Sequence, residues 1–264
     1  MLEPKLHFQR FEFKYLISLD RLKEIKSFLQ RYVVLDKFLE GTGKNFYEVV
    51  SLYYDSPRFY YYWQKVDGIE QRKKVRLRAY RINGKFTDYS FFEIKRKRDS
   101  IILKDRLLLL NGDYDKLLKD GNFFRTNFII NEKNNKVAEE FHWETYQRSI
   151  SPKILVVYNR EPYLGKFNKN FRVTFDYFIK ARRDNQLFAG GDNFIDLSAD
   201  KAVMEVKFNG RMPFYIQEII KMYNLERISY SKYAHAVEGC FDFPLLNQLG
   251  YSFSTAEKTI NSLI

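Results

Sequence analysis

Charged and apolar side chains alternate with a period of two along several short segments of this chain, and this alternation restricts how the chain can fold. In RFEFKYLI, residues 10–17, Arg10, Glu12 and Lys14 share one parity, and aromatic or aliphatic residues occupy the other. Successive side chains of a β-strand point to opposite faces, so the segment predicts a strand with one charged and one apolar face. A helical period of 3.6 would mix the two classes.

The same alternation recurs along the chain. In each segment the charged or polar side chains share one parity, and they are Arg72, Lys74, Arg76 and Arg78; Glu93, Lys95 and Lys97; Tyr158 and Arg160; Arg172, Thr174 and Asp176; and Glu205 and Lys207. Residues 47–55 and 101–109 predict two more strands, the second with Lys104 and Arg106 on one parity. Helices are predicted over residues 18–33 and 135–148, from Pro57, from Pro213 and after Ser231. We therefore predict an α+β fold, mainly antiparallel β, in a single domain of residues 1–264, with residues 245–264 as an accessory tail helix.

A short unit, apolar-Glu-apolar-Lys, occurs three times within these segments. The three copies carry the pairs Glu12 and Lys14, Glu93 and Lys95, and Glu205 and Lys207. From the composition of the chain alone, the number of such units expected by chance is roughly one third. In a strand the two charges of each unit point the same way, about 6.5–7 Å apart. Each unit therefore presents one carboxylate and one ammonium on a single face.

The charged faces are mostly basic, in a chain with 45 Lys and Arg against 33 Asp and Glu, a net charge of +12. Alternation of this kind is common on a sheet with one solvated face. These faces, however, hold few Ser, Thr, Asn or Gln, so we predict that they converge on one lumen. Because a lumen of Arg and Lys repels itself when empty, it suits a polyanion such as a chain of phosphates. Carboxylates within it predict Mg²⁺ or Mn²⁺, which bridge carboxylate and phosphate oxygens.

Several classes of protein are excluded. No apolar run reaches the ~18–20 residues that span a bilayer, and the first residues contain no apolar signal core. Cys240 is the only cysteine, which excludes an intramolecular disulfide framework and a multi-thiolate zinc site. His7, His142 and His235 show no metal-ligand spacing and are interpreted as structural. We expect a cytoplasmic protein.

Eight segments in order resemble one known group: RFEFKYLI, SLYYDSP, KVRLRAY, FFEIKRKRD with KDR, PKILVVYNREPY, FRVTFD, VMEVKFNGRMP and SKYAHAVE. The group is the triphosphate tunnel metalloenzymes, or CYTH-like superfamily. Within it, the chain resembles the VTC domain, the polyphosphate polymerase module of the vacuolar transporter chaperone complex and its bacterial relatives. The resemblance covers most of residues 8–240.

The resemblance implies an eight-stranded antiparallel β-barrel, closed around a polar tunnel, with helices packed outside. It implies phosphate or substrate contacts from Lys14, Arg76, Arg78, Lys95, Lys97, Arg106, Tyr158, Arg160, Arg172, Lys207 and Lys232. It also implies metal binding by Glu205, with Glu12, Glu93 and Asp176 as further metal or supporting groups. The residues expected to act in catalysis are Arg76, Arg78, Arg160, Arg172 and Glu205.

The activity that the resemblance implies is transfer of the terminal phosphoryl group of ATP, or another nucleoside triphosphate, to a growing polyphosphate chain. Hydrolytic members begin with Glu-x-Glu-x-Lys, whereas Arg10 stands at the first of these positions here, which favours the polymerase. The alternatives are a triphosphatase or tripolyphosphatase of the same fold, a non-catalytic binder of polyphosphate or nucleic acid, and cyclisation of ATP. Nucleic acid is disfavoured because the aromatic residues mostly alternate away from the basic ones. A separate membrane protein could receive the product.

Overall fold

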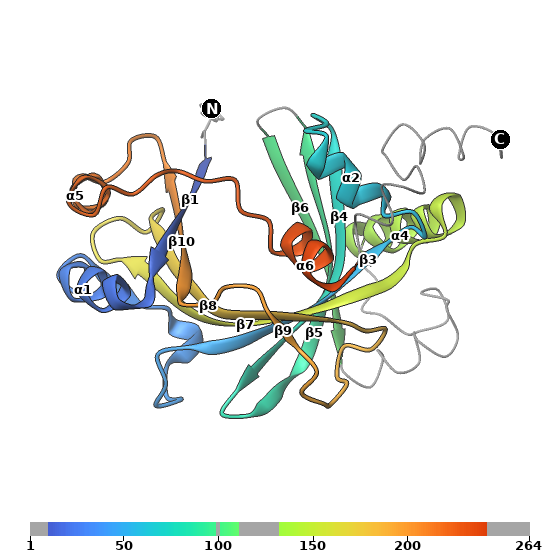
Figure 1. Ribbon diagram of the computed structural model, residues 1–264, viewed down its shortest axis with the longest axis horizontal. Helices are drawn as coiled ribbons and strands as arrows, with labels where there is room; N and C mark the ends of the chain where they lie inside the picture. Colours follow the sequence, from blue (N-terminus) through green and yellow to red (C-terminus); the bar gives the residue numbers. More distant parts are fainter. Residues whose placement is uncertain (1–9, 99–100, 111–131, 242–264) are drawn as a thin grey trace. The chain divides into compact units, whose positions relative to one another are not determined.

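The computed structural model describes residues 10–98, 101–110 and 132–241 of the chain (Figure 1). His7 and the predicted tail helix at residues 245–264 lie outside these ranges. The described residues form two compact units. Unit 1 contains residues 10–48, 158–179 and 198–231, and unit 2 contains the rest. The prediction of a single domain stays a prediction.

Strands dominate both units, as the alternation predicts. In chain order the elements are β1 (Arg10–Ser18), α1 (Leu19–Leu29), β2 (Val33–Leu35), the 3₁₀ helix η1 (Lys37–Leu39), β3 (Tyr47–Asp55), α2 (Tyr60–Val66), β4 (Arg72–Ile82), β5 (Lys85–Arg98), β6 (Ile101–Leu110), α4 (Glu132–Arg148), β7 (Ser151–Gly165), β8 (Arg172–Arg183), β9 (Ile195–Asp196), β10 (Lys201–Asn209), α5 (Phe214–Met222) and α6 (Lys232–Cys240). Every strand predicted from sequence is present, so the α+β, mainly antiparallel prediction is confirmed.

The strands follow the hydrogen-bonded order β1-β10-β8-β7-β3-β4-β5-β6, with β2 paired to β7 and β9 to β8. The pairings of β1 with β10, β10 with β8, β4 with β5 and β5 with β6 are all antiparallel. Among the described strands this path ends at β1 and at β6. Closure of the sheet into a barrel is therefore not confirmed.

In unit 1 the apolar parity of the strands packs under helices α1 and α5 (Figure 1). Tyr15 of β1, Phe175 of β8 and Met204 of β10 are all buried against Ile25 of α1 and Ile216 of α5. Ser18 caps α1, since its hydroxyl accepts from the Arg21 backbone N–H at 3.4 Å. The opposite parity of the same strands carries the charged residues.

Unit 2 repeats this arrangement with different helices. Leu52 of β3, Leu77 of β4, Phe92 of β5 and Leu107 of β6 form one buried cluster, and Phe141 of α4 packs on it. The polar segment predicted to be helical over residues 135–148 is therefore α4, which covers the apolar face of this sheet. The charged parity of β4, β5 and β6 lies on the other face.

Two helix boundaries differ from the prediction. The helix expected to begin at Pro57 begins at Tyr60, because Phe59 adopts a left-handed conformation with φ 56° and interrupts the first turn. The Ser56 hydroxyl nevertheless accepts from the backbone N–H of Tyr60, the first residue of the helix, at 3.0 Å. Helix α1 ends at Leu29 because the chain enters β2 at Val33. Within the described ranges, no helix combines the length and apolar character that crossing a bilayer requires.

Candidate phosphate-binding and metal-binding residues

Two of the three Glu-x-Lys units lie side by side in unit 1. In the antiparallel pairing of β1 with β10, Glu12 is opposite Lys207 and Lys14 is opposite Glu205. The Lys207 ammonium is 2.7 Å from Glu205 and 3.6 Å from Glu12, and the Lys14 ammonium is 3.5 Å and 3.3 Å from the same carboxylates. These four residues, called the quartet below, form a ring of alternating charge.

Lys14 has a further contact outside the quartet. Besides the two carboxylates, its ammonium donates to the backbone carbonyl of Tyr230 at 3.2 Å. Burial lowers the pKa of Lys14, but the charges of Glu205 and Glu12 outweigh it, so the pKa lies above its ordinary value. Lys14 is therefore a fixed positive charge across the physiological pH range.

Arg160 and Asp176 form a second buried pair in unit 1. The Nε and Nη2 groups of Arg160 donate to the two carboxylate oxygens of Asp176 at 2.6 and 2.7 Å, a bidentate geometry. Asp176 is fully buried. Burial lowers the pKa of Arg160, but Asp176 outweighs it and raises the pKa well above the ordinary value. The guanidinium also lies 5.4 Å from the ring centroid of Tyr158. This pair fixes the plane of Arg160.

Arg172 lies next to the quartet. It is directly opposite Lys207 in the β8–β10 pairing, a juxtaposition of like charges that is unfavourable in a sheet. An ion pair of 3.2 Å with Asp36 partly offsets this repulsion. The Arg172 side chain is 35% exposed, more than the side chains of Arg160 and Asp176. It is therefore accessible to a ligand.

The third Glu-x-Lys unit is the centre of a cation cluster in unit 2. Glu93 is 1% exposed, and its β5 position is opposite Arg76 of β4 and Arg106 of β6. Its carboxylate is 2.6 Å from Arg76, 2.6 Å from Lys104, 2.9 Å from Arg106 and 3.9 Å from Arg78. One carboxylate thus faces three guanidinium groups and one lysine amine. These five residues are called the Glu93 cluster below.

The pKa values of the Glu93 cluster reflect this excess of positive charge. Burial raises the pKa of Glu93, but Arg76, Arg78 and Lys104 outweigh it and hold the pKa well below its ordinary value. Burial and then the charge of Arg76 lower the pKa of Lys104 to about 6, although Glu93 opposes the shift. Arginine does not lose its proton in proteins, so Lys104 is the cation of the cluster that titrates.

The remaining predicted site residues lie around these groups. Lys95 is half-buried and stands between Lys74 of β4 and Lys104 of β6 in the strand register. Lys97 is opposite Arg72. Lys232 begins α6 and lies near enough to Tyr53 to lower the pKa of its phenol. The structure therefore brings Arg76, Arg78, Lys95 and Arg106 together on adjacent strands of unit 2.

Two residues of this region were not singled out from the sequence. Lys104 contacts Glu93 directly, and its shared parity with Arg106 was the signal that could have identified it. Tyr53 accepts a hydrogen bond from Arg76 Nη1 at 3.0 Å. No signal marked Tyr53, because β3 is apolar on both parities. Arg78 is similarly supported, donating to the Ser51 hydroxyl at 3.1 Å.

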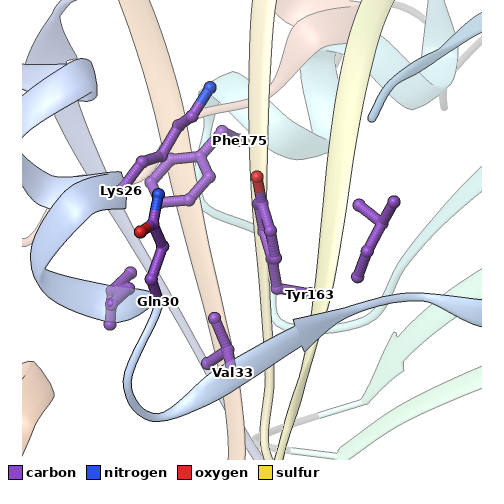
Figure 2. A pocket seen from close by; sticks show the side chains of 7 residues that line it. Lys26, Gln30, Val33, Tyr163 and Phe175 are labelled. Carbon is purple, nitrogen blue, oxygen red and sulfur yellow. The ribbon is translucent and has the colours of Figure 1, made fainter. Parts of the chain in front are cut away.

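A cavity of about 200 Å³ in unit 1 lies apart from these charged groups. Figure 2 shows Lys26 of α1 and Gln30, the C-cap residue of that helix, beside Tyr163 and Phe175, which belong to the apolar parity of β7 and β8. The neighbouring Glu161 carboxylate accepts from Lys26, Tyr163 and Tyr177, each at 3.0 Å. These polar groups therefore already satisfy one another, and we do not include the cavity in the candidate site.

The carboxylates differ in their suitability for a metal ion. Among the described residues, no group of three or more His, Cys, Asp or Glu is arranged to hold one. Both oxygens of Asp176 and both of Glu93 face guanidinium or ammonium groups, which favours a role in holding those cations. Both oxygens of Glu12 and of Glu205 also face ammonium groups, but these two side chains are 17% and 8% exposed, against 0% for Asp176 and 1% for Glu93, and they offer accessible hard oxygen donors. Phosphate oxygens would have to complete such a site.

His235 and His142 contribute nothing comparable. His235 Nδ1 lies 3.2 Å from Glu238 of the same helix, and His142 is exposed on α4. Neither histidine belongs to the quartet or to the Glu93 cluster. Their interpretation as structural residues stays a prediction.

Comparisons with known proteins cover most of the chain. A family model described as the VTC domain matches residues 9–241. A search of curated proteins finds no match. A solved structure of a proposed adenylate cyclase from Bacillus halodurans is 13% identical, with a TM-score of 0.44, over 83% of this chain and 92% of that one. The PH1819 protein from Pyrococcus horikoshii OT3 is 14% identical, with a TM-score of 0.39, over 84% and 96%.

Proposed function

Because the chain belongs to the VTC-domain family, we propose that it is a metal-dependent polyphosphate polymerase, a phosphotransferase working within a closed eight-stranded tunnel. It moves the terminal phosphoryl group of ATP, or of another nucleoside triphosphate, onto a growing polyphosphate chain in the cytoplasm. Its partners are the nucleotide, polyphosphate and, for delivery of the product, a separate membrane protein. Nucleic acid is not among them.

The Glu93 cluster is the observation that carries this proposal. Its single buried carboxylate faces Arg76, Arg78, Lys104 and Arg106. An excess of positive charge at that density is costly in a partly buried site unless an anion compensates it. A chain of phosphates supplies several charges along a line, which a carboxylate ligand or a single phosphate does not. The cluster therefore supports an oligophosphate substrate.

Phosphoryl transfer asks the protein mainly for positioning and neutralisation of charge. We propose this role for Arg76, Arg78, Arg160 and Arg172, whose planar guanidinium groups suit bidentate contact with phosphate oxygens. Asp176 orients Arg160 through its bidentate ion pair. No general base is needed, because the attacking oxygen of the terminal phosphate is already ionised.

Glu12 and Glu205 are the residues that would hold Mg²⁺ or Mn²⁺, with Glu205 as the principal ligand. When bound, the ion would neutralise charge on the transferring phosphoryl group. Lys14 and Lys207, which are within 3.6 Å of these carboxylates, are proposed to contact phosphate oxygens beside them. Lys95, Lys97, Arg106, Tyr158 and Lys232 are proposed as further phosphate contacts.

The test is synthesis of polymer by the purified full chain. We incubate it with ATP and Mn²⁺ or Mg²⁺ and analyse the products on a gel stained for polyphosphate. Arg76→Gln should lower the rate by about 10²-fold, by analogy with other lost transition-state donors. Arg81→Gln is the matched control, because Arg81 lies on the same strand but stacks on Phe86 at 5.4 Å, away from Glu93. Its rate should equal that of the wild type.

The outcome also separates the alternatives. Release of phosphate without chain growth would identify a triphosphatase of the same fold. A cyclic nucleotide product would identify a cyclase. If the protein binds polyphosphate but no variant, metal or nucleotide gives turnover, and binding survives both chelator and Glu205→Gln, the protein is a passive binding module.

A further inference from the structure

The phenol of Tyr53 makes a direct contact with the Arg76 guanidinium that the proposed reaction does not yet use. Arg76 Nη1 donates to the Tyr53 hydroxyl oxygen at 3.0 Å, and the guanidinium carbon lies 5.7 Å from the centroid of the same ring. On its other edge, Arg76 Nε and Nη2 face one oxygen of Glu93 at 2.7 and 2.6 Å. Glu93 alone would leave the guanidinium able to swing about that oxygen. Tyr53 restrains this motion from a second direction.

Tyr53 is itself held rigidly. It is 4% exposed, and its ring stacks on Tyr233 of α6 with centroids 5.0 Å apart and an interplanar angle of 28°. The Tyr233 hydroxyl donates to a carboxylate oxygen of Asp55, the last residue of β3. A stacked neighbour anchored at its far end keeps the Tyr53 ring in one orientation.

Asp55 provides a firm anchor for Tyr233. It is fully buried, and its carboxylate accepts from the backbone N–H groups of Ser56 at 2.7 Å, Tyr61 at 2.9 Å and Tyr62 at 3.0 Å. These donors belong to the connection into α2 and to its first turn. The end of β3, the start of α2 and the first turn of α6 are therefore joined at one carboxylate.

The electrostatic setting of Tyr53 agrees with an acceptor role toward Arg76. Burial raises the pKa of its phenol, but the charges of Arg76 and Arg78 outweigh this and leave the pKa below its ordinary value. Positive charge on that side strengthens the hydrogen bond that the hydroxyl oxygen accepts. The contact is thus a charge-assisted hydrogen bond in a buried place, where its geometry is well defined.

We propose that Tyr53 is a positioning residue for the Arg76 guanidinium, supported by stacking on Tyr233 and by the anchoring of Tyr233 at Asp55. This inference rests on the proposed function, because Arg76 is assigned there as a phosphate ligand. Tyr53 acts through Arg76 and fixes the plane in which that guanidinium meets phosphate oxygens. Misplacement of a binding group by about 1 Å can reduce rates by 10²-fold, so loss of this restraint should be measurable.

Tyr53→Phe is the informative change, since it removes the hydroxyl and keeps the ring, its stacking and its contact with the guanidinium face. We measure binding of inorganic tripolyphosphate to the full chain by titration calorimetry, and kcat and KM for ATP. The expected result is about tenfold weaker binding of tripolyphosphate and a lower kcat, with little change in the melting temperature. Tyr233→Phe, which loses only the anchor at Asp55, should shift both values in the same direction by a smaller factor.

Tyr62→Phe is the matched control. It also removes a phenol from unit 2, but that hydroxyl contacts Glu238 of α6 at 3.4 Å. Binding and turnover of this variant should equal those of the wild type. The same fold-change in Tyr62→Phe as in Tyr53→Phe would show a general effect of losing a phenol and would overturn the proposal.

A double variant separates positioning from a structural role. If Tyr53 acts through Arg76, Tyr53→Phe should have no further effect on tripolyphosphate binding in an Arg76→Gln background. An undiminished effect in that background, or wild-type binding by Tyr53→Phe alone, overturns the inference. A wild type that binds tripolyphosphate and makes no polymer defeats the polymerase proposal, while the binding comparison still decides the role of Tyr53. A wild type that binds no tripolyphosphate overturns both.

Discussion

Replacing Lys104 with methionine should remove the proton uptake that accompanies phosphate binding. The pKa of Lys104 is lowered to about 6 by burial and by Arg76, and Glu93 only partly opposes this. At pH 8 about 1% of such a lysine is protonated. A bound polyanion adds negative charge beside it and raises its pKa, so binding draws a proton from solution. Methionine matches the length of the side chain and removes the titrating group.

The magnitude follows from linkage between protonation and binding. If the bound polyanion raises the pKa of Lys104 to about 9 or higher, binding at pH 8 takes up close to one proton, and the affinity falls by up to about tenfold for each pH unit above 6. Binding of the polyanion takes up protons and does not release them, because the pKa of Lys104 is lower in the free protein than in the complex. Acidification therefore tightens binding.

Titration calorimetry with tripolyphosphate in two buffers of different ionisation enthalpy measures the number of protons. The ligand itself can exchange protons, so the quantity that tests the reasoning is the difference between the wild type and Lys104→Met. A difference near one proton at pH 8 is predicted. Equal proton uptake by the two proteins, or affinities that respond identically to pH, would refute the assignment of Lys104 as the titrating cation.

Three further changes test other parts of the structure. Asp176→Asn leaves the buried Arg160 guanidinium without its carboxylate, and urea denaturation should show a loss of about 3–5 kcal/mol in unfolding free energy. Asp55 has a folded pKa of about 6, raised by burial from 3.8, so its contribution to stability is full below pH 3.8 and lost as pH rises through 6. Between pH 4 and pH 7, the unfolding free energy of the wild type should fall by about 2–3 kcal/mol more than that of Asp55→Asn. Equal pH dependence of the unfolding free energy in the two proteins would contradict this. Glu205→Gln should abolish metal-dependent turnover, and isothermal titration calorimetry should show weaker binding of Mn²⁺. Unchanged Mn²⁺ binding would show that Glu205 is not a metal ligand.

Alternation along the strands was sufficient to predict most of the fold. Arg10 to Ser18 and Arg72 to Ile82 form β1 and β4 as expected, because a period of two is compatible only with a strand that has two different faces. The start of α2 was wrong, since a left-handed residue such as Phe59 leaves no mark in the sequence. Pro57 is favoured at a first helical position, yet the conformation of Phe59 delays the helix to Tyr60.

The candidate site was less accessible from the sequence than the fold. The Glu-x-Lys units supplied the residue types, but the register that places Glu12 opposite Lys207 depends on pairing between strands nearly 200 positions apart. The four basic residues around Glu93 likewise come from two other strands, β4 and β6. Asp176 was expected to be a metal or supporting group, and only the side-chain geometry showed that Arg160 engages both of its oxygens. Local patterns do not encode such long-range contacts.

The central claim is that this chain lengthens polyphosphate, and the fate of the γ-phosphate of ATP tests it most directly. With γ-labelled ATP and Mn²⁺, the label should enter an acid-stable, gel-resolved ladder of increasing chain length, in step with the ADP that is released. Label that appears only as free phosphate while ADP accumulates, or that remains in ATP under every metal condition, would contradict it.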